Sequence, residues 1–160
     1  MQLIFSTLWS KITAQNAWQI ERGLNDFRAI KNQGKPFLME HYNKLHKASV
    51  AFLKQSFSQQ ASGLPSVVVT HHVPTFMNYP EQYKGDAFNQ AFATELFDLV
   101  ADSNASHWIY GHHHSPTPSF IIGGTKLVCN QLGYVDANEH RSFVCNQVLD
   151  VVTEKKTQNS

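Results

Sequence analysis

Two clusters of histidine contain the residues of this sequence that are best suited to chemistry. His71 and His72 form the first cluster, and His112, His113 and His114 form an uninterrupted triplet. Neutral imidazole is the commonest side-chain ligand for metals such as zinc, copper and iron. Because five of the nine histidines fall in these two short segments, the sequence predicts a metal site.

Both clusters follow segments that have the composition of buried strands. Residues 66–70 read Ser-Val-Val-Val-Thr, and residues 107–110 combine aromatic with β-branched side chains. Open α/β sheets bind ligands beyond the carboxyl ends of their strands, which is where both clusters fall. Successive side chains of extended backbone point to opposite sides. We therefore expect His112 and His114 to face the metal, and His113 to point away.

The four remaining histidines lack this context. A single histidine near a strand end is more often a hydrogen-bonded loop residue than a ligand, whereas two clusters at two strand ends favour ligation. We interpret the isolated histidines as structural or solvent-facing: His41, His46, His107 and His140.

The hydrophobic pattern predicts an α/β chain with one long helix. That helix is expected over residues 36–59, opened by Pro36, with apolar side chains at steps of three or four on one face. The face comprises Leu38, Tyr42, Leu45, Phe52, Leu53 and Phe57. Other helical segments are expected at residues 24–30 and 89–101, and other strands at residues 3–8, 120–122, 126–130 and 143–152.

Composition narrows the classes of protein to consider. A net charge of +1 gives no electrostatic case for binding nucleic acid. No apolar run approaches the roughly 20 residues of a membrane span, and the amino terminus lacks the pattern of a secretory signal. Cys129 and Cys145 have no paired spacing, so we expect reduced, buried thiols in a cytoplasmic protein.

Several motifs resemble those of the calcineurin-like metallophosphoesterases. Residues 67–74, Val-Val-Val-Thr-His-His-Val-Pro, resemble the family's fourth motif, and residues 110–114 resemble the fifth, Gly-His-x-His. Residues 123–134 are similar to the hairpin and Asn-x-x-Gly-Tyr loop that follow it, and residues 5–10 to the Thr-Leu-Trp strand that precedes the fourth motif. The resemblance covers residues 1–134 in the family's order.

This resemblance implies a fold and a chemistry. The fold would be α/β, a four-layer α-β-β-α sandwich with mixed β-sheets. Residues 1–152 would form its carboxyl-terminal part, and residues 153–160 a polar tail. His71 and His112 would ligate the second of two divalent metals, His114 the first, and His72 would lie near the substrate or support the ligands. Two such ions (Mn, Fe, Zn or Mg, which the motifs do not distinguish) hydrolyse phosphate esters in the family.

The family's first three motifs, Asp-x-His, Gly-Asp-x-x-Asp and Gly-Asn-His, have no match here. The single Gly-Asp, Gly85-Asp86, follows the His71 motif and is therefore out of order. Three imidazoles without a bridging carboxylate cannot hold two dications against their repulsion, but they suit one zinc-like ion with an open position. A zinc hydrolase of the metallo-β-lactamase type is disfavoured, because Ser115-Pro116 stands where its aspartate belongs.

Two interpretations of the function remain open, and neither assigns a catalytic residue. The chain is a metal-dependent phosphoesterase that is incomplete by itself and is completed by an amino-terminal fragment or by an oligomer. Alternatively, it is an inactive remnant, or a module that binds one metal in a structural role. Either way, missing strands would leave apolar surface uncovered, so we expect the chain alone to associate or dissolve poorly.

Overall fold

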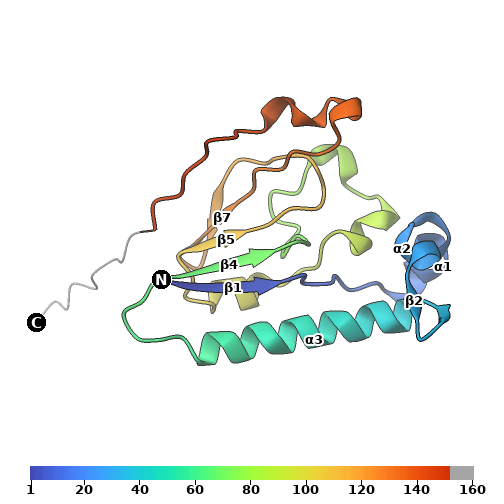
Figure 1. Cartoon of the computed structure of the whole chain (residues 1–160), viewed down its shortest axis with the longest axis horizontal. Coiled ribbons are helices and arrows are strands. Elements are labelled where there is room, and N and C mark those ends of the chain that lie inside the picture. The colour runs from blue at the N-terminus through green and yellow to red at the C-terminus, as the bar shows by residue number, and fades with distance from the viewer. Residues whose placement is uncertain (152–160) are drawn as a thin grey trace, which may run out of the picture.

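The computed structural model describes residues 1–151, which form a mixed α/β fold built on one five-stranded sheet. The strand order is β1-β4-β5-β7-β6; the first four strands are parallel and β6 runs antiparallel to β7 (Figure 1). The strands are β1 (Gln2–Ser6), β4 (Ser66–Thr70), β5 (His107–Ile109), β6 (Phe120–Ile122) and β7 (Thr125–Val128). The expected strands at residues 66–70 and 120–122 are confirmed, and those at 3–8, 107–110 and 126–130 differ by one or two residues at their ends.

A row of large apolar side chains crosses the parallel strands and forms the centre of the core. Register pairs Ile4 with Val68, Val68 with Trp108, and Trp108 with Leu127, and all four are buried. Burial of each such side chain contributes roughly 1.5–3 kcal/mol. The row fixes the relative positions of the strand ends that carry the histidines.

The long helix α3 (Met39–Ser58) packs along the β1 side of the sheet (Figure 1). It begins after the expected Pro36, which belongs instead to the short strand β3 (Lys35–Pro36). Its buried residues are Tyr42, His46 and Leu53, whereas Leu45 and Phe52 are exposed. The buried face of α3 is therefore rotated about the helix axis relative to the predicted face. His46 takes part in the buried face because its Nδ1 lies 2.7 Å from the carbonyl oxygen of Trp9.

Residues 9–37 form a second small core at one end of α3. Two helices, α1 (Ala14–Gly23) and α2 (Asp26–Ala29), and the hairpin of β2 (Lys31–Asn32) with β3 gather there (Figure 1). The helical piece predicted at residues 24–30 is confirmed as α2, and α1 was not predicted. The buried members of this core are Ile12, Ile20, Phe27, Phe37, Tyr42 and Ala91.

The prediction of one continuous helix over residues 89–101 was wrong. The chain forms a 3₁₀ turn, η2 (Ala87–Ala91), and a short helix, α4 (Phe97–Ala101). Between them, Val73 donates its backbone N–H to Phe92 and accepts one from Thr94. Because the Phe92 carbonyl and the Thr94 N–H are bonded to Val73, neither is available to continue a helix from η2 into α4.

Residues 143–151 do not form the strand expected at 143–152; residue 152 and the expected tail lie outside the described residues. The side chain of Asn130 pairs with both polar groups of the Val144 backbone, at 2.7 and 3.0 Å. The Asn130 side chain thus makes the hydrogen bonds that a neighbouring strand would otherwise make with Val144. Cys129 and Cys145 are free thiols, but neither is fully buried as expected: Cys129 is half-buried and Cys145 is exposed. No helix within residues 1–151 is long and apolar enough to cross a membrane.

Candidate metal centre

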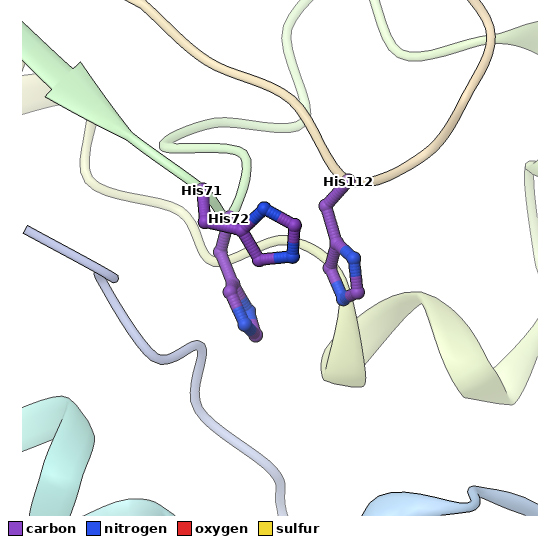
Figure 2. A group of neighbouring side chains, drawn as sticks. All are labelled: His71, His72 and His112. Carbon is purple, nitrogen blue, oxygen red and sulfur yellow. The ribbon is translucent and has the colours of Figure 1, made fainter. Parts of the chain in front are cut away.

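His71, His72 and His112 come together at the carboxyl ends of β4 and β5 (Figure 2). The two strands are parallel neighbours, so the segments that follow them leave the sheet side by side. One ring nitrogen from each of the three residues lies within 4.8 Å of the others. The ring centroids of His71 and His72 each lie 4.4 Å from that of His112. The sequence prediction of a shared histidine site at these strand ends agrees with this geometry.

Backbone contacts extend the pairing of β4 and β5 to the histidines. Gly111 donates its N–H to the carbonyl oxygen of His71 at 3.2 Å, one step beyond the strands. His112 then adopts a left-handed conformation, with φ of 78°. Only a few per cent of non-glycine residues have positive φ, and histidine is among those that tolerate it. This turn directs the His112 ring back toward His71.

Burial keeps the three imidazoles neutral. It lowers the pKa of His72 to about 2, with His112 and His71 contributing further. Burial, followed by the neighbouring His71, lowers the pKa of His112 to about 4. The pKa of His71 is also lowered, first by burial and then by His114. A neutral imidazole keeps a lone pair, which is the form that binds a metal.

The hydrogen bonds of His72 distinguish it from the other two histidines. Ser10 donates its backbone N–H to Nδ1 of His72 at 3.3 Å. The nearby hydroxyls do not need Nδ1 as an acceptor, because Ser10 Oγ donates to the Gln90 carbonyl and Tyr42 Oη to the Ala91 carbonyl. With Nδ1 accepting, the proton of the neutral ring is on Nε2. His72 therefore offers an N–H toward the cluster, and its geometry favours His71 and His112 as the ligands.

The donor set fits a single transition-metal ion better than a pair. Zinc bonds to imidazole nitrogen at about 2.0–2.1 Å, which in a tetrahedron separates the nitrogens by about 3.3 Å. The ring nitrogens lie within 4.8 Å of one another, which exceeds this separation by at most about 1.5 Å. Among the residues that the structure describes, no carboxylate belongs to this group.

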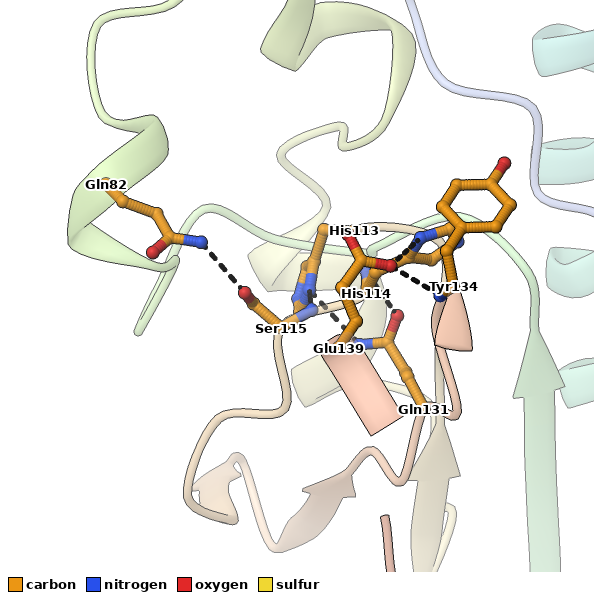
Figure 3. A network of polar contacts seen from close by, with 7 residues as sticks. All are labelled: Gln82, His113, His114, Ser115, Gln131, Tyr134 and Glu139. Carbon is orange, nitrogen blue, oxygen red and sulfur yellow. Dashed lines mark hydrogen bonds and ion pairs between the residues drawn. The ribbon is translucent and has the colours of Figure 1, made fainter. Parts of the chain in front are cut away.

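His114 lies outside the group, contrary to the alternation expected for the triplet. Its φ of 53°, together with the positive φ of His112, shows that the triplet is not extended. Nδ1 of His114 lies 3.0 Å from Oε2 of Glu139 (Figure 3). His113 is buried, and its Nδ1 interacts with Gln131 Nε2 at 3.1 Å. Sequence reasoning missed Glu139, Gln131, Ser10 and Tyr42, because nothing in the spacing indicates these long-range contacts.

A cavity of about 550 Å³ opens beside the histidines. His112, His113 and His114 form one wall. Aromatic side chains and carboxylates form the rest, including Tyr79, Tyr83, Phe88, Phe92, Tyr134, Asp26, Asp86 and Glu139. Its volume lies in the range of sites that bind small molecules. The described residues that line it include no lysine or arginine, so the cavity itself supplies no cation to balance an anionic ligand.

Comparisons with known proteins do not assign a family. No family model and no solved structure matches the chain. An uncharacterized protein of Acanthamoeba polyphaga mimivirus is 28% identical over 162 residues, which cover 94% of this chain and 56% of that protein. The chain therefore spans about half the length of this curated relative. The likeness to metallophosphoesterases consequently rests on the motifs alone.

Proposed function

We propose that this chain carries the histidine half of a metallophosphoesterase site, with a phosphate ester as substrate and divalent metal as cofactor. The observation that carries the metal part of the proposal is the convergence of His71, His72 and His112 at two adjacent strand ends. The phosphoesterase part rests on the order of the motifs around them.

In this proposal His71 and His112 hold a divalent ion through their neutral ring nitrogens. Such an ion supplies Lewis acidity and an acidified water for attack on phosphorus. The Nε2–H of His72 points toward the same region and donates a hydrogen bond to a ligand oxygen there. Tyr42 and Ser10 keep the His72 ring in place, since both lie within 3.5 Å of its Nδ1. The cavity beside His112 holds the rest of the ester.

The complete site requires groups from elsewhere. We propose that the five-stranded sheet and α3 form one side of a four-layer sandwich in a cytoplasmic protein. An amino-terminal fragment or a second copy would complete it. The exposed Leu3 and Phe5 on β1 support this, because they form an apolar strip on the face opposite Ile4.

A second function is supported by a specific observation. Within the described residues the cluster lacks a carboxylate, and His114 is paired with Glu139. These facts favour a module that binds one ion without turnover. In that case the metal would tie β4 to β5 and stabilise the fold, since binding to the native state alone adds directly to stability.

The test combines metal content with hydrolysis of p-nitrophenyl phosphate and of its bis ester in the presence of Mn²⁺. Wild type is compared with His112→Ala and with His41→Gln, a histidine outside the cluster. We expect bound metal in wild type and His41→Gln, and its loss in His112→Ala. Turnover that His112→Ala abolishes supports a phosphoesterase whose site a second copy completes. Metal without turnover supports the structural module or a phosphoesterase half that needs its amino-terminal fragment. Wild-type protein that binds no metal rules out both.

A further inference from the structure

We propose that Glu139 is a positioning residue that fixes the tautomer of His114 and so presents the Nε2 lone pair of His114 to the cavity as a second ligand position. This inference deepens the proposed metal site and rests on it for the identity of the ligand. The orientation of His114 itself does not depend on a metal.

The hydrogen bonds determine where the proton of His114 must be. Oε2 of Glu139 accepts from two donors, His114 Nδ1 at 3.0 Å and the backbone N–H of Tyr134 at 2.5 Å (Figure 3). An ionised carboxylate can only accept, so Nδ1 must carry a proton. In the neutral ring Nε2 then keeps the lone pair. Carboxylates orient metal-binding histidines in this way in many metalloproteins, and their loss typically weakens affinity 10–100-fold.

The position of the Glu139 side chain depends on Gly133. Gly133 has a φ of +66°, and a Cβ added there would lie 2.5 Å from Cβ and 2.7 Å from Oε2 of Glu139. Both distances are far below ordinary contact. The loop after β7 can therefore bring Glu139 to His114 only with glycine at position 133.

His114 is also held from other directions. Its backbone N–H donates to Oε1 of Gln131 at 2.8 Å, and the ring of Tyr134 lies edge-on at 4.6 Å. The left-handed backbone of His114 is costly for a non-glycine residue and persists only where the surroundings impose it. Within the described residues, Nε2 of His114 has no hydrogen-bond partner. Contacts with Glu139, Gln131 and Tyr134 thus hold His114 and leave one ring nitrogen free.

His114 and His112 line the same cavity, although His114 lies outside the group of His71, His72 and His112. A second ion, or the substrate side of a single ion, can therefore contact His114 while His71 and His112 hold their own ligand.

The experiment is histidine ¹⁵N NMR on the full chain without metal, near pH 8, well above the ordinary imidazole pKa of about 6.5. We expect His114 of wild type as the Nδ1–H tautomer. We expect Nε2–H to become its major form in Glu139→Ala. Gly133→Ala should produce the same change because it displaces Glu139. Asp136→Asn, which removes an exposed carboxylate from the same loop, should leave the tautomer as in wild type.

Zinc titration of the same proteins gives the second readout. Glu139→Gln keeps the shape of the side chain and should weaken the zinc affinity that depends on His114 by about 10–100-fold. Wild-type His114 in the Nε2–H form, or a Glu139→Ala spectrum identical to that of Asp136→Asn, overturns the proposal. If the tautomer changes as expected but no variant or wild type binds zinc, the positioning role stands and the metal function fails.

Discussion

Ser10 donates its backbone N–H to Nδ1 of His72, 62 residues further along the chain. This hydrogen bond places the free proton of His72 on Nε2 and makes the residue a donor toward the histidine cluster. Within residues 1–151 no donor occupies a ring nitrogen of His71 or His112, and the Ala91 carbonyl beside His112 can only accept from an N–H, so each of these two residues can present a lone pair. The three neighbouring imidazoles therefore have two different chemical roles.

Substitution of the three histidines should separate these roles. We expect His71→Gln and His112→Gln to lower zinc affinity by about 100-fold or more, because each removes a ligand. His72→Gln should lower it by about tenfold, the low end of the range for residues that support ligands. Isothermal titration of each variant with zinc measures the difference. Equal losses for His72→Gln and His112→Gln would show that His72 is itself a ligand.

The metal-free chain should lose stability on acidification. The pKa of His112 is about 4 in the folded protein, because of burial and then His71, against about 6.5 unfolded. The unfolded chain therefore binds more protons between these values. The stabilisation is complete above about pH 6.5 and is lost as pH falls toward 4, by on the order of 3 kcal/mol from this group. Urea unfolding at a series of pH values measures the free energy of unfolding across this range. That free energy should fall less steeply with pH in His112→Gln than in wild type, and an equally steep fall would contradict the lowered pKa of His112.

One hydroxyl links the core to the histidine cluster. Thr70 Oγ1 accepts from Trp108 Nε1 at 3.0 Å and donates to the His72 carbonyl at 2.9 Å. Thr70→Val keeps the volume but leaves both buried partners unpaired. We expect it to lower the free energy of unfolding by about 2–4 kcal/mol, since each unpaired group costs about 1–3 kcal/mol. Thr70→Ser, which keeps the hydroxyl, should lose less. Denaturant titration measures the free energy of unfolding of both variants. Equal losses of this free energy would assign the effect to packing alone.

The apolar strip on β1 should drive association of the chain. Leu3 is 51% and Phe5 61% exposed, on an edge strand whose ten surrounding residues, 1–10, contain no charge. Edge strands of this kind pair readily with other chains. Phe5→Lys should shift the chain toward monomer in light scattering. Ile121→Lys is the control, because Ile121 is 64% exposed on β6 at the opposite edge. Monomeric wild-type protein, or an equal effect of both variants, would contradict this role of β1.

The strands at the centre of the sheet and the position of the site could be predicted from the sequence. The Val67-Val68-Val69 run is unambiguous because it is buried on both faces, and parallel strands bring their carboxyl ends together. The proximity of His71 and His112 could therefore be predicted from the local pattern, whereas their choice as ligands came from the resemblance to metallophosphoesterases.

The rest depended on contacts that local pattern does not encode. The side chains of residues 112–114 do not alternate as expected for extended backbone, because the backbone is left-handed at His112 and at His114. Residues 92–94 are not helical as expected, because Phe92 and Thr94 form backbone hydrogen bonds with Val73. The buried face of α3 was rotated because His46, a polar residue, found the Trp9 carbonyl as a partner. In the last two cases a distant hydrogen bond outweighed the local preference.

The most direct test of the central claim is the absorption spectrum of the chain titrated with Co²⁺, which reports the number and geometry of bound ligands. We expect saturation with at least one tightly bound ion per chain, and a visible spectrum that His112→Ala abolishes and His41→Gln preserves. A wild-type chain that binds no Co²⁺, or a spectrum unchanged in His112→Ala, would show that His71, His72 and His112 do not form a metal site.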